Sequence, residues 1–180
     1  PPMDDVRVRR ALSMAIDRVK LNDTVLQKSN SPAYSITPPD TMGYNPPKLF
    51  DYDPEQARAL LADAGYPDGE GWPHVELIYN TSESHRKIAV ALQQMWKDAL
   101  NITDSIDTMN FDIARRGWIG DYVDANNFLD LYITDGGNNS TGFSNPRYDE
   151  MILQLAPRAK TQEERFAIFY EAETLLMEQM

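Results

Sequence analysis

Residues 115–122 combine side chains suited to binding a small molecule, in the order Arg-Arg-Gly-Trp-Ile-Gly-Asp-Tyr. Glycines leave backbone groups accessible, so an extended ligand could pair with this segment through main-chain hydrogen bonds. Trp118 offers a large aromatic surface, and the Asp121 carboxylate suits a ligand ammonium group. In a competing structural interpretation, Trp118 and Tyr122 belong to the core and Asp121 caps the next helix. Residue types alone leave both interpretations open, and the structural one is the commoner case.

Motifs for catalysis or metal binding are poorly represented. The two histidines, His74 and His85, belong to no H-E-x-x-H motif, and the sequence lacks G-x-S-x-G and a glycine-rich phosphate loop. Asp121 and Asp124 could serve a glycosidase as acid and base, but 28 acidic residues create such pairs by chance. The stretch 135–139 lacks the spacing of a calcium loop, and there is no cysteine. We therefore expect no catalytic residues, no metal site and no cofactor.

Length and charge narrow the class of protein further. A chain of 180 residues can form one domain with a sizeable core. The net charge of −11 repels a phosphate backbone, so nucleic acid is not an expected partner. No apolar run approaches the ~20 residues that a membrane-spanning helix needs. We expect a folded monomer.

Periodicity predicts helices that alternate with a few strands, which indicates an α/β protein. The predicted helices cover residues 5–18, 53–64, 83–100, 125–132, 145–155 and 161 onward. The predicted strands cover 75–79 and 111–119, with a weaker candidate around Ile102. Proline-rich residues 30–52 and Gly/Asn-rich residues 135–141 predict surface loops.

Four helix starts and one helix end carry specific capping signals. Asp4 or Asp5 can cap the first helix. Asp53 and Asn145 each precede a proline at a predicted helix start, and Gly65 follows the helix that starts after Asp53. Thr161 and Glu164 have the spacing of a capping box. These signals predict where the helices begin and end from residues near each boundary.

Six segments, in one order along nearly the whole chain, resemble family 5 solute-binding proteins, most closely the oligopeptide-binding receptors of ABC importers. The segments are VRRALSMAIDR (8–18), DYDPEQARALLADAGYPDG (51–69), YNTSESHRKIA (79–89), DIARRGWIGDY (112–122), NFLDLY (127–132) and NNSTGFSNPRYDEMI (138–152). The resemblance implies a two-lobed periplasmic binding protein fold of type II, similar to cluster C. Residues 1–180 would form a single C-terminal-side lobe, a mixed sheet flanked by helices, excised from a longer receptor whose first lobe is missing.

The resemblance also implies a peptide-binding site. The ammonium-binding aspartate of the family matches Asp121, and the strand that pairs with the peptide backbone matches Gly117, Trp118 and Ile119. Trp118 would also line a side-chain pocket.

Groups that meet the peptide carboxylate in such receptors match His85 and Arg115. Asn80 and Asn138 match polar positions that line the pocket.

The chain departs from the family pattern between Ile102 and Phe111. Family members usually carry about a dozen more residues there, including a strand, and a second carboxylate-binding arginine expected near Met109. Without them, the carboxylate subsite and the preferred peptide length are not determined by the resemblance.

By resemblance, then, the chain binds short peptides and delivers them to a membrane ABC permease, without catalysis. It would work in the periplasm, or as a lipoprotein on the outer face of the cytoplasmic membrane. The alternatives are a receptor of the same fold for a nickel complex, an oligosaccharide or another solute, a carboxylate-dependent hydrolase, and a chaperone-like or sensory domain.

Overall fold

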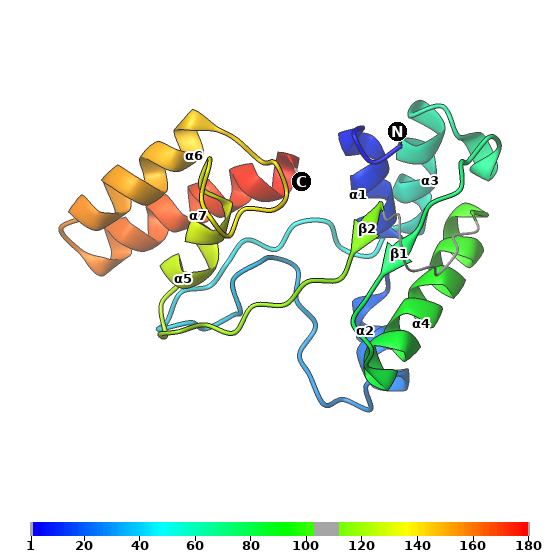
Figure 1. Cartoon of the computed structure of the whole chain (residues 1–180), viewed down its shortest axis with the longest axis horizontal. Coiled ribbons are helices and arrows are strands. Elements are labelled where there is room, and N and C mark those ends of the chain that lie inside the picture. The colour runs from blue at the N-terminus through cyan, green and yellow to red at the C-terminus, as the bar shows by residue number, and fades with distance from the viewer. Residues whose placement is uncertain (1, 103–111, 180) are drawn as a thin grey trace. The chain divides into compact units, whose positions relative to one another are not determined.

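The computed structural model describes residues 2–102 and 112–179 and divides the chain into two compact units (Figure 1). The first unit comprises Pro1–Pro32 and Phe50–Gly117, and the second comprises Ala33–Leu49 and Trp118–Met180. The chain therefore passes from one unit to the other after Pro32, after Leu49 and after Gly117. Each unit has its own buried cluster. That residues 1–180 act as one lobe stays a prediction.

The first predicted helix is two helices, α1 (Val6–Met14) and α2 (Arg18–Thr24). Asp5 caps α1 by accepting from the Arg7 N–H, as expected, and hydrogen bonds from the Arg7 side chain and backbone lower the pKa of Asp5 to about 2. The prediction of one helix to residue 18 is wrong. Asp17 has extended backbone and accepts from the Lys20 N–H, so it caps a new helix.

Local signals fix α3 (Pro54–Asp63) as predicted. The Asp53 side chain accepts from the Gln56 N–H at 2.9 Å, and Pro54 occupies the first turn. The helix ends before Gly65, whose φ of +102° favours glycine. A short 3₁₀ turn, η1 (Pro67–Gly69), then leads toward the first strand.

One parallel pair of strands lies in the described part of the first unit. β1 (Leu77–Ile78) pairs with β2 (Ile113–Ala114), and α4 (Glu83–Leu100) lies between them in sequence. Both strands are shorter than predicted, and residues 115–120 continue without regular structure. Ile102 is buried but forms no strand. The other predictions for this region, on the segment up to Phe111 and near Met109, lie outside the described residues.

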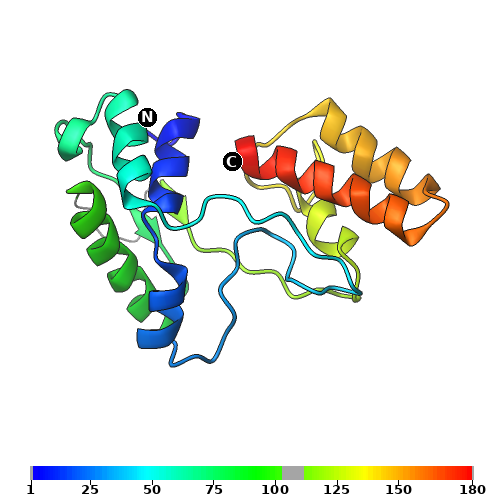
Figure 2. The ribbon, with the colours of Figure 1, turned by 180° about the vertical axis from the view of Figure 1, so that it is seen from behind.

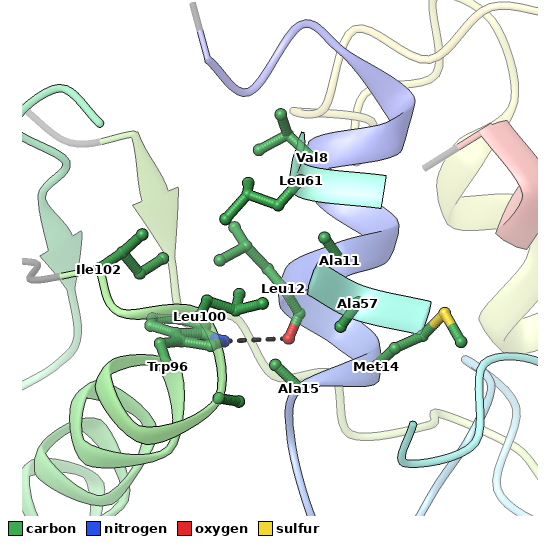
Figure 3. Close-up of a cluster of buried hydrophobic side chains, with 11 residues drawn as sticks. Val8, Ala11, Leu12, Met14, Ala15, Ala57, Leu61, Trp96, Leu100 and Ile102 are labelled. Carbon is green, nitrogen blue, oxygen red and sulfur yellow. Dashed lines mark hydrogen bonds between the residues drawn. The ribbon is translucent and has the colours of Figure 1, made fainter. Parts of the chain in front are cut away.

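The core of the first unit gathers around Trp96 of α4 (Figure 3). Its side chain is 3% exposed, and its Nε1–H donates to the Leu12 carbonyl of α1 at 3.0 Å. On α4, Trp96 and Ala99 are buried, whereas Ile88, Leu92 and Met95 are half-buried. The other members of the cluster come from α1, α3, the end of α4 and the residues directly after α1 and α4: Val8, Ala11, Leu12, Met14, Ala15, Ala57, Leu61, Leu100 and Ile102.

Replacing Trp96 with Phe should lower the free energy of unfolding of the first unit by about 1–3 kcal/mol, because the buried Leu12 carbonyl loses its donor. Urea denaturation measures the change. Val90→Ala on the same helix is the control, since Val90 is half exposed and should change stability by less than about 0.5 kcal/mol. Equal effects of the two changes would contradict this account of the core.

The second unit consists of helices joined by long loops in its described part, as the two opposite views show (Figures 1 and 2). The predicted helix over 125–132 is α5 (Asn126–Leu129) followed by the 3₁₀ turn η2 (Asp130–Tyr132). The next begins as α6 (Pro146–Glu150), continues as the π-helix η3 (Met151–Leu155) and ends as the 3₁₀ turn η4 (Ala156–Arg158). The last helix is α7 (Gln162–Gln179), against which α5, α6 and η3 pack.

Two helix starts in this unit confirm sequence signals. Asn145 caps α6 by accepting from the Arg147 and Tyr148 N–H groups. At α7, Thr161 Oγ1 accepts from the Glu164 N–H at 3.1 Å, as in a capping box. The Glu164 carboxylate accepts from the Lys160 N–H at 2.7 Å, one residue earlier than the capping box predicts.

The long loop at 33–49 belongs to the second unit because a buried carboxylate of α7 binds it. Glu173 is 0% exposed and accepts hydrogen bonds from the Ile36 N–H at 3.0 Å, the Thr37 N–H at 2.7 Å and the Tyr44 hydroxyl at 2.9 Å. Burial raises the pKa of Glu173, although these donors act in the opposite direction. Tyr44 packs edge-on against Phe169 of the same helix. Residues 33–49 thus contribute to the core of the second unit and do not form only the surface loop that the sequence predicts.

Candidate ligand-binding site

Four of the predicted site residues lie in the first unit, close to one edge of its strand pair. Arg115 directly follows β2, and its N–H donates to the Ile78 carbonyl of β1 at 2.8 Å. Asn80 lies two residues beyond the end of β1. Parallel strands end at the same edge of a sheet, and ligands of open α/β sheets bind beyond that edge.

The start of α4 contributes His85. The His85 Nδ1 and the Asn80 Oδ1 form a hydrogen bond, so the side chain beyond β1 orients the imidazole. Ser82 precedes α4 but makes no capping hydrogen bond with its side chain. The hydrogen bond between Asn80 and His85 thus assigns Asn80 the role of orienting the imidazole.

The Arg115 guanidinium is exposed and lies against Gly117. A Cβ atom at position 117 would be 3.3 Å from both terminal guanidinium nitrogens, so glycine allows this close approach. Within residues 2–102 and 112–179, no carboxylate pairs with Arg115. The first unit thus presents a cation and an imidazole, groups that can bind an anionic ligand end.

The second unit holds Trp118, Ile119 and Asp121. The Trp118 indole is half-buried, and its Nε1–H donates to the Asn127 Oδ1 of α5 at 2.8 Å. Ile119 is 91% exposed and Tyr122 is 52% exposed. The structural interpretation that places Tyr122 in the core is therefore wrong. For Trp118 the same interpretation holds only in part, because the indole is half-buried.

Asp121 does not cap the next helix, which corrects the other part of that interpretation. The Asp124 carboxylate accepts from the Asn126 N–H at 2.8 Å and from Arg165 at 2.6 and 2.9 Å. Burial alone would raise the pKa of Asp124, but these bonds lower it overall. In the part of the chain that the structure describes, the exposed Asp121 carboxylate accepts no hydrogen bond and pairs with no cation.

The negative charge of Asp121 affects the pKa of Asp130. Burial raises the pKa of Asp130, and the charge of Asp121 raises it further. A ligand cation at Asp121 would relieve this repulsion.

Asn138 is exposed, and none of the described residues forms a hydrogen bond with its side chain. The adjacent Asn139 organises this loop instead. Its Nδ2 donates to the carbonyls of Tyr132, Ile133 and Phe143, and its Oδ1 accepts from Thr141. Sequence reasoning missed both Asn139 and Asn127, although both lie within the segments that resemble the family.

The first unit supplies a guanidinium and an imidazole, which can bind an anionic group. The second unit supplies an aromatic ring and a carboxylate, and the carboxylate can bind a cationic group. Among the described residues, no three His, Asp or Glu side chains are grouped as metal ligands. None of the described helices is long and apolar enough to cross a bilayer.

Comparisons with known proteins identify the family of this chain. The family model described as "Bacterial extracellular solute-binding proteins, family 5 Middle" matches residues 1–140. The periplasmic murein peptide-binding protein MppA of Escherichia coli K12 is 40% identical over 99% of the chain. The chain spans 36% of the length of that relative.

Solved structures share the fold. The structure of the Escherichia coli murein tripeptide binding protein MppA superimposes with a TM-score of 0.90 at 38% identity, covering 99% of this chain and 38% of that one. Haemophilus influenzae OppA in complex with the peptide RPPGFSPFR gives a TM-score of 0.86 at 28% identity, covering 98% of this chain and 38% of that one. The prediction of a lobe of the two-lobed periplasmic binding fold, with mixed helix and sheet content, is thereby confirmed.

Proposed function

Because the chain belongs to the family 5 bacterial extracellular solute-binding proteins, we propose that it is a ligand-binding lobe of a receptor that captures short peptides for an ABC importer. The observation that carries this proposal is the Asp121 carboxylate, which is exposed three residues after Trp118 and has no partner among the described residues. A peptide has an ammonium group that this carboxylate suits.

Binding would require both charged ends of the peptide to be satisfied. Asp121 would hold the ammonium end, and His85 and Arg115 would meet the carboxylate end. Gly117, Trp118 and Ile119 would offer backbone groups to the peptide main chain, which makes binding insensitive to side-chain identity. Asn80 would orient His85, and Asn138 would line a side-chain pocket.

The rest of the receptor would complete the site. Residues 1–180 would form one lobe, and a further lobe would close over the peptide, so that its polar groups are surrounded on both sides. The receptor would work as a monomer in the periplasm, free or held by a lipid anchor, and deliver peptide to a membrane permease. Nothing in this mechanism needs a cofactor or a catalytic group.

Native mass spectrometry of the full-length receptor, purified from its host, tests the function directly. We expect co-purifying masses in the range of short peptides, which partial denaturation releases. A receptor that carries a non-peptide solute, or that binds none of a panel of di- to pentapeptides in calorimetry, would overturn the proposal.

The two-lobe account makes a separate prediction for the isolated 180 residues. They should bind tri- to pentapeptides at least about 100-fold more weakly than the full-length receptor, because half of the enclosing contacts would be lost. Isothermal titration of both proteins measures the difference. Equal affinities would show that these residues contain the whole site.

A further inference from the structure

The segment from Trp118 to Tyr122 is fastened at both ends by one buried side chain. Asn127 of α5 is 2% exposed. Its Oδ1 accepts from the Trp118 Nε1–H at 2.8 Å, and its Nδ2 donates to the Tyr122 carbonyl at 3.2 Å. A single amide therefore closes a loop of five residues that contains Asp121.

An amide is the side-chain group that can make both bonds at once. Its oxygen meets a donor, the indole N–H, and its nitrogen meets an acceptor, the main-chain carbonyl. An aspartate at position 127 could keep the first bond, but it would set a carboxylate oxygen against the Tyr122 carbonyl. A leucine would fill a similar volume and make neither bond.

Asn127 is itself held in place. Its N–H donates to the Asp124 carbonyl at 3.1 Å, and Asp124 is bound by two hydrogen bonds from Arg165 of α7. The same loop passes close to Phe128 of α5, because a Cβ added at Gly120 would lie 3.3 Å from the Phe128 ring. The loop is thus bound to α5 through the side chain of Asn127, and α5 is linked to α7 through the ion pair of Asp124 with Arg165.

We infer that Asn127 is the positioning residue of the ligand-binding loop: it holds Trp118 and sets the loop conformation from which Asp121 meets the ligand ammonium. This inference rests on the proposed function for its ligand, but the two hydrogen bonds are independent of it. A loop ordered before binding does not have to be ordered by the ligand, which increases affinity. Asn127 acts through the loop and need not touch the ligand.

The experiment compares Asn127→Leu with Asn126→Leu in the full-length receptor. Asn126 is the neighbouring residue on α5, and among the described residues its side chain makes no hydrogen bond, so the control makes the same change without removing the bridge. The first measurement is the ¹⁵N–¹H signal of the Trp118 indole, identified by its loss in Trp118→Phe. In Asn127→Leu its exchange with solvent should become at least about tenfold faster, and in Asn126→Leu it should not change. Asn127→Asp should keep the slow indole exchange.

The second measurement is the affinity for tri-alanine. Asn127→Leu should weaken it about tenfold, and the loss should shrink when Asp121 is already Asn, because both changes then act on the same contact. An unchanged indole signal would overturn the inference, and so would a loss that is undiminished in the Asp121→Asn background. If the wild-type receptor does not bind tri-alanine, or if Asp121→Asn alone has no effect, the proposed function or its ammonium site fails. The indole exchange then still decides whether Asn127 holds the loop.

Discussion

Replacing Asp121 with Asn in the full-length receptor should weaken the binding of tri-alanine by about 30-fold to several thousand-fold. Asp121 is the carboxylate that we assign to the ligand ammonium, and truncating one partner of an enclosed charge pair typically costs about 2–5 kcal/mol. N-acetylation of the peptide should weaken binding to the wild type to a similar extent. The two changes together should be less than additive, since they remove the same pair.

Isothermal titration of both peptides to both receptors gives the four affinities of this cycle. Asp68→Asn is the matched control: it removes the same charge at an exposed position in η1, where the φ of 53° suits asparagine as well as aspartate. If the acetylated peptide binds the wild type as tightly as the free peptide, the ammonium does not bind at Asp121.

Replacing Glu173 with Ala should lower the free energy of unfolding of the second unit by at least about 3 kcal/mol. The change leaves three donors, from Ile36, Thr37 and Tyr44, without their acceptor, and each buried unsatisfied group costs about 1–3 kcal/mol. Urea denaturation measures the total, and amide hydrogen exchange should show faster exchange at residues 33–49.

Glu171→Ala on the same helix is the control for this prediction. The Glu171 side chain is 59% exposed and pairs with Arg147, so its removal should cost less than about 1 kcal/mol. Equal losses in the two variants would show that Glu173 does not hold the loop.

The stability difference between wild type and Glu173→Ala should also depend on pH. Burial raises the pKa of Glu173 in the folded state above the usual value of 4.5, so its protonated form is favoured by folding. The stabilisation is therefore greatest below pH 4.5 and decreases as the pH rises through the folded-state pKa. Denaturation at pH 4 and pH 8 should show the larger difference at pH 4, and a larger difference at pH 8 would contradict this sign.

Helix boundaries illustrate how far local sequence determined the structure. α3 begins at Pro54 and α6 at Pro146, as Asp53 and Asn145 predict, because a cap acts on backbone groups two or three residues away. The same local rule explains the error at α1. Periodicity places Asp17 within the first predicted helix, although aspartate is also a good cap, and periodicity does not distinguish the two roles.

Assigning the candidate site needed both kinds of information. Resemblance along six segments marked Asp121, Trp118, His85 and Arg115 as candidates, and it also indicated the family. It could not separate a ligand-binding Asp121 from a capping one. The structure excludes the capping role, because the Asn126 N–H donates to Asp124 and not to Asp121. That Asp121 binds a ligand stays a prediction.

The sequence by itself thus determined most of the helical elements, most of their limits and the family, since these depend on neighbouring residues or on motifs in a fixed order. The tertiary structure alone decided which polar side chains meet. Glu173 binds Tyr44 from 129 residues away, and Asn127 holds Trp118 through a bond that neither residue's periodicity predicts. Such contacts depend on how separate elements pack, and a buried polar group must then find its partner wherever packing brings one within reach.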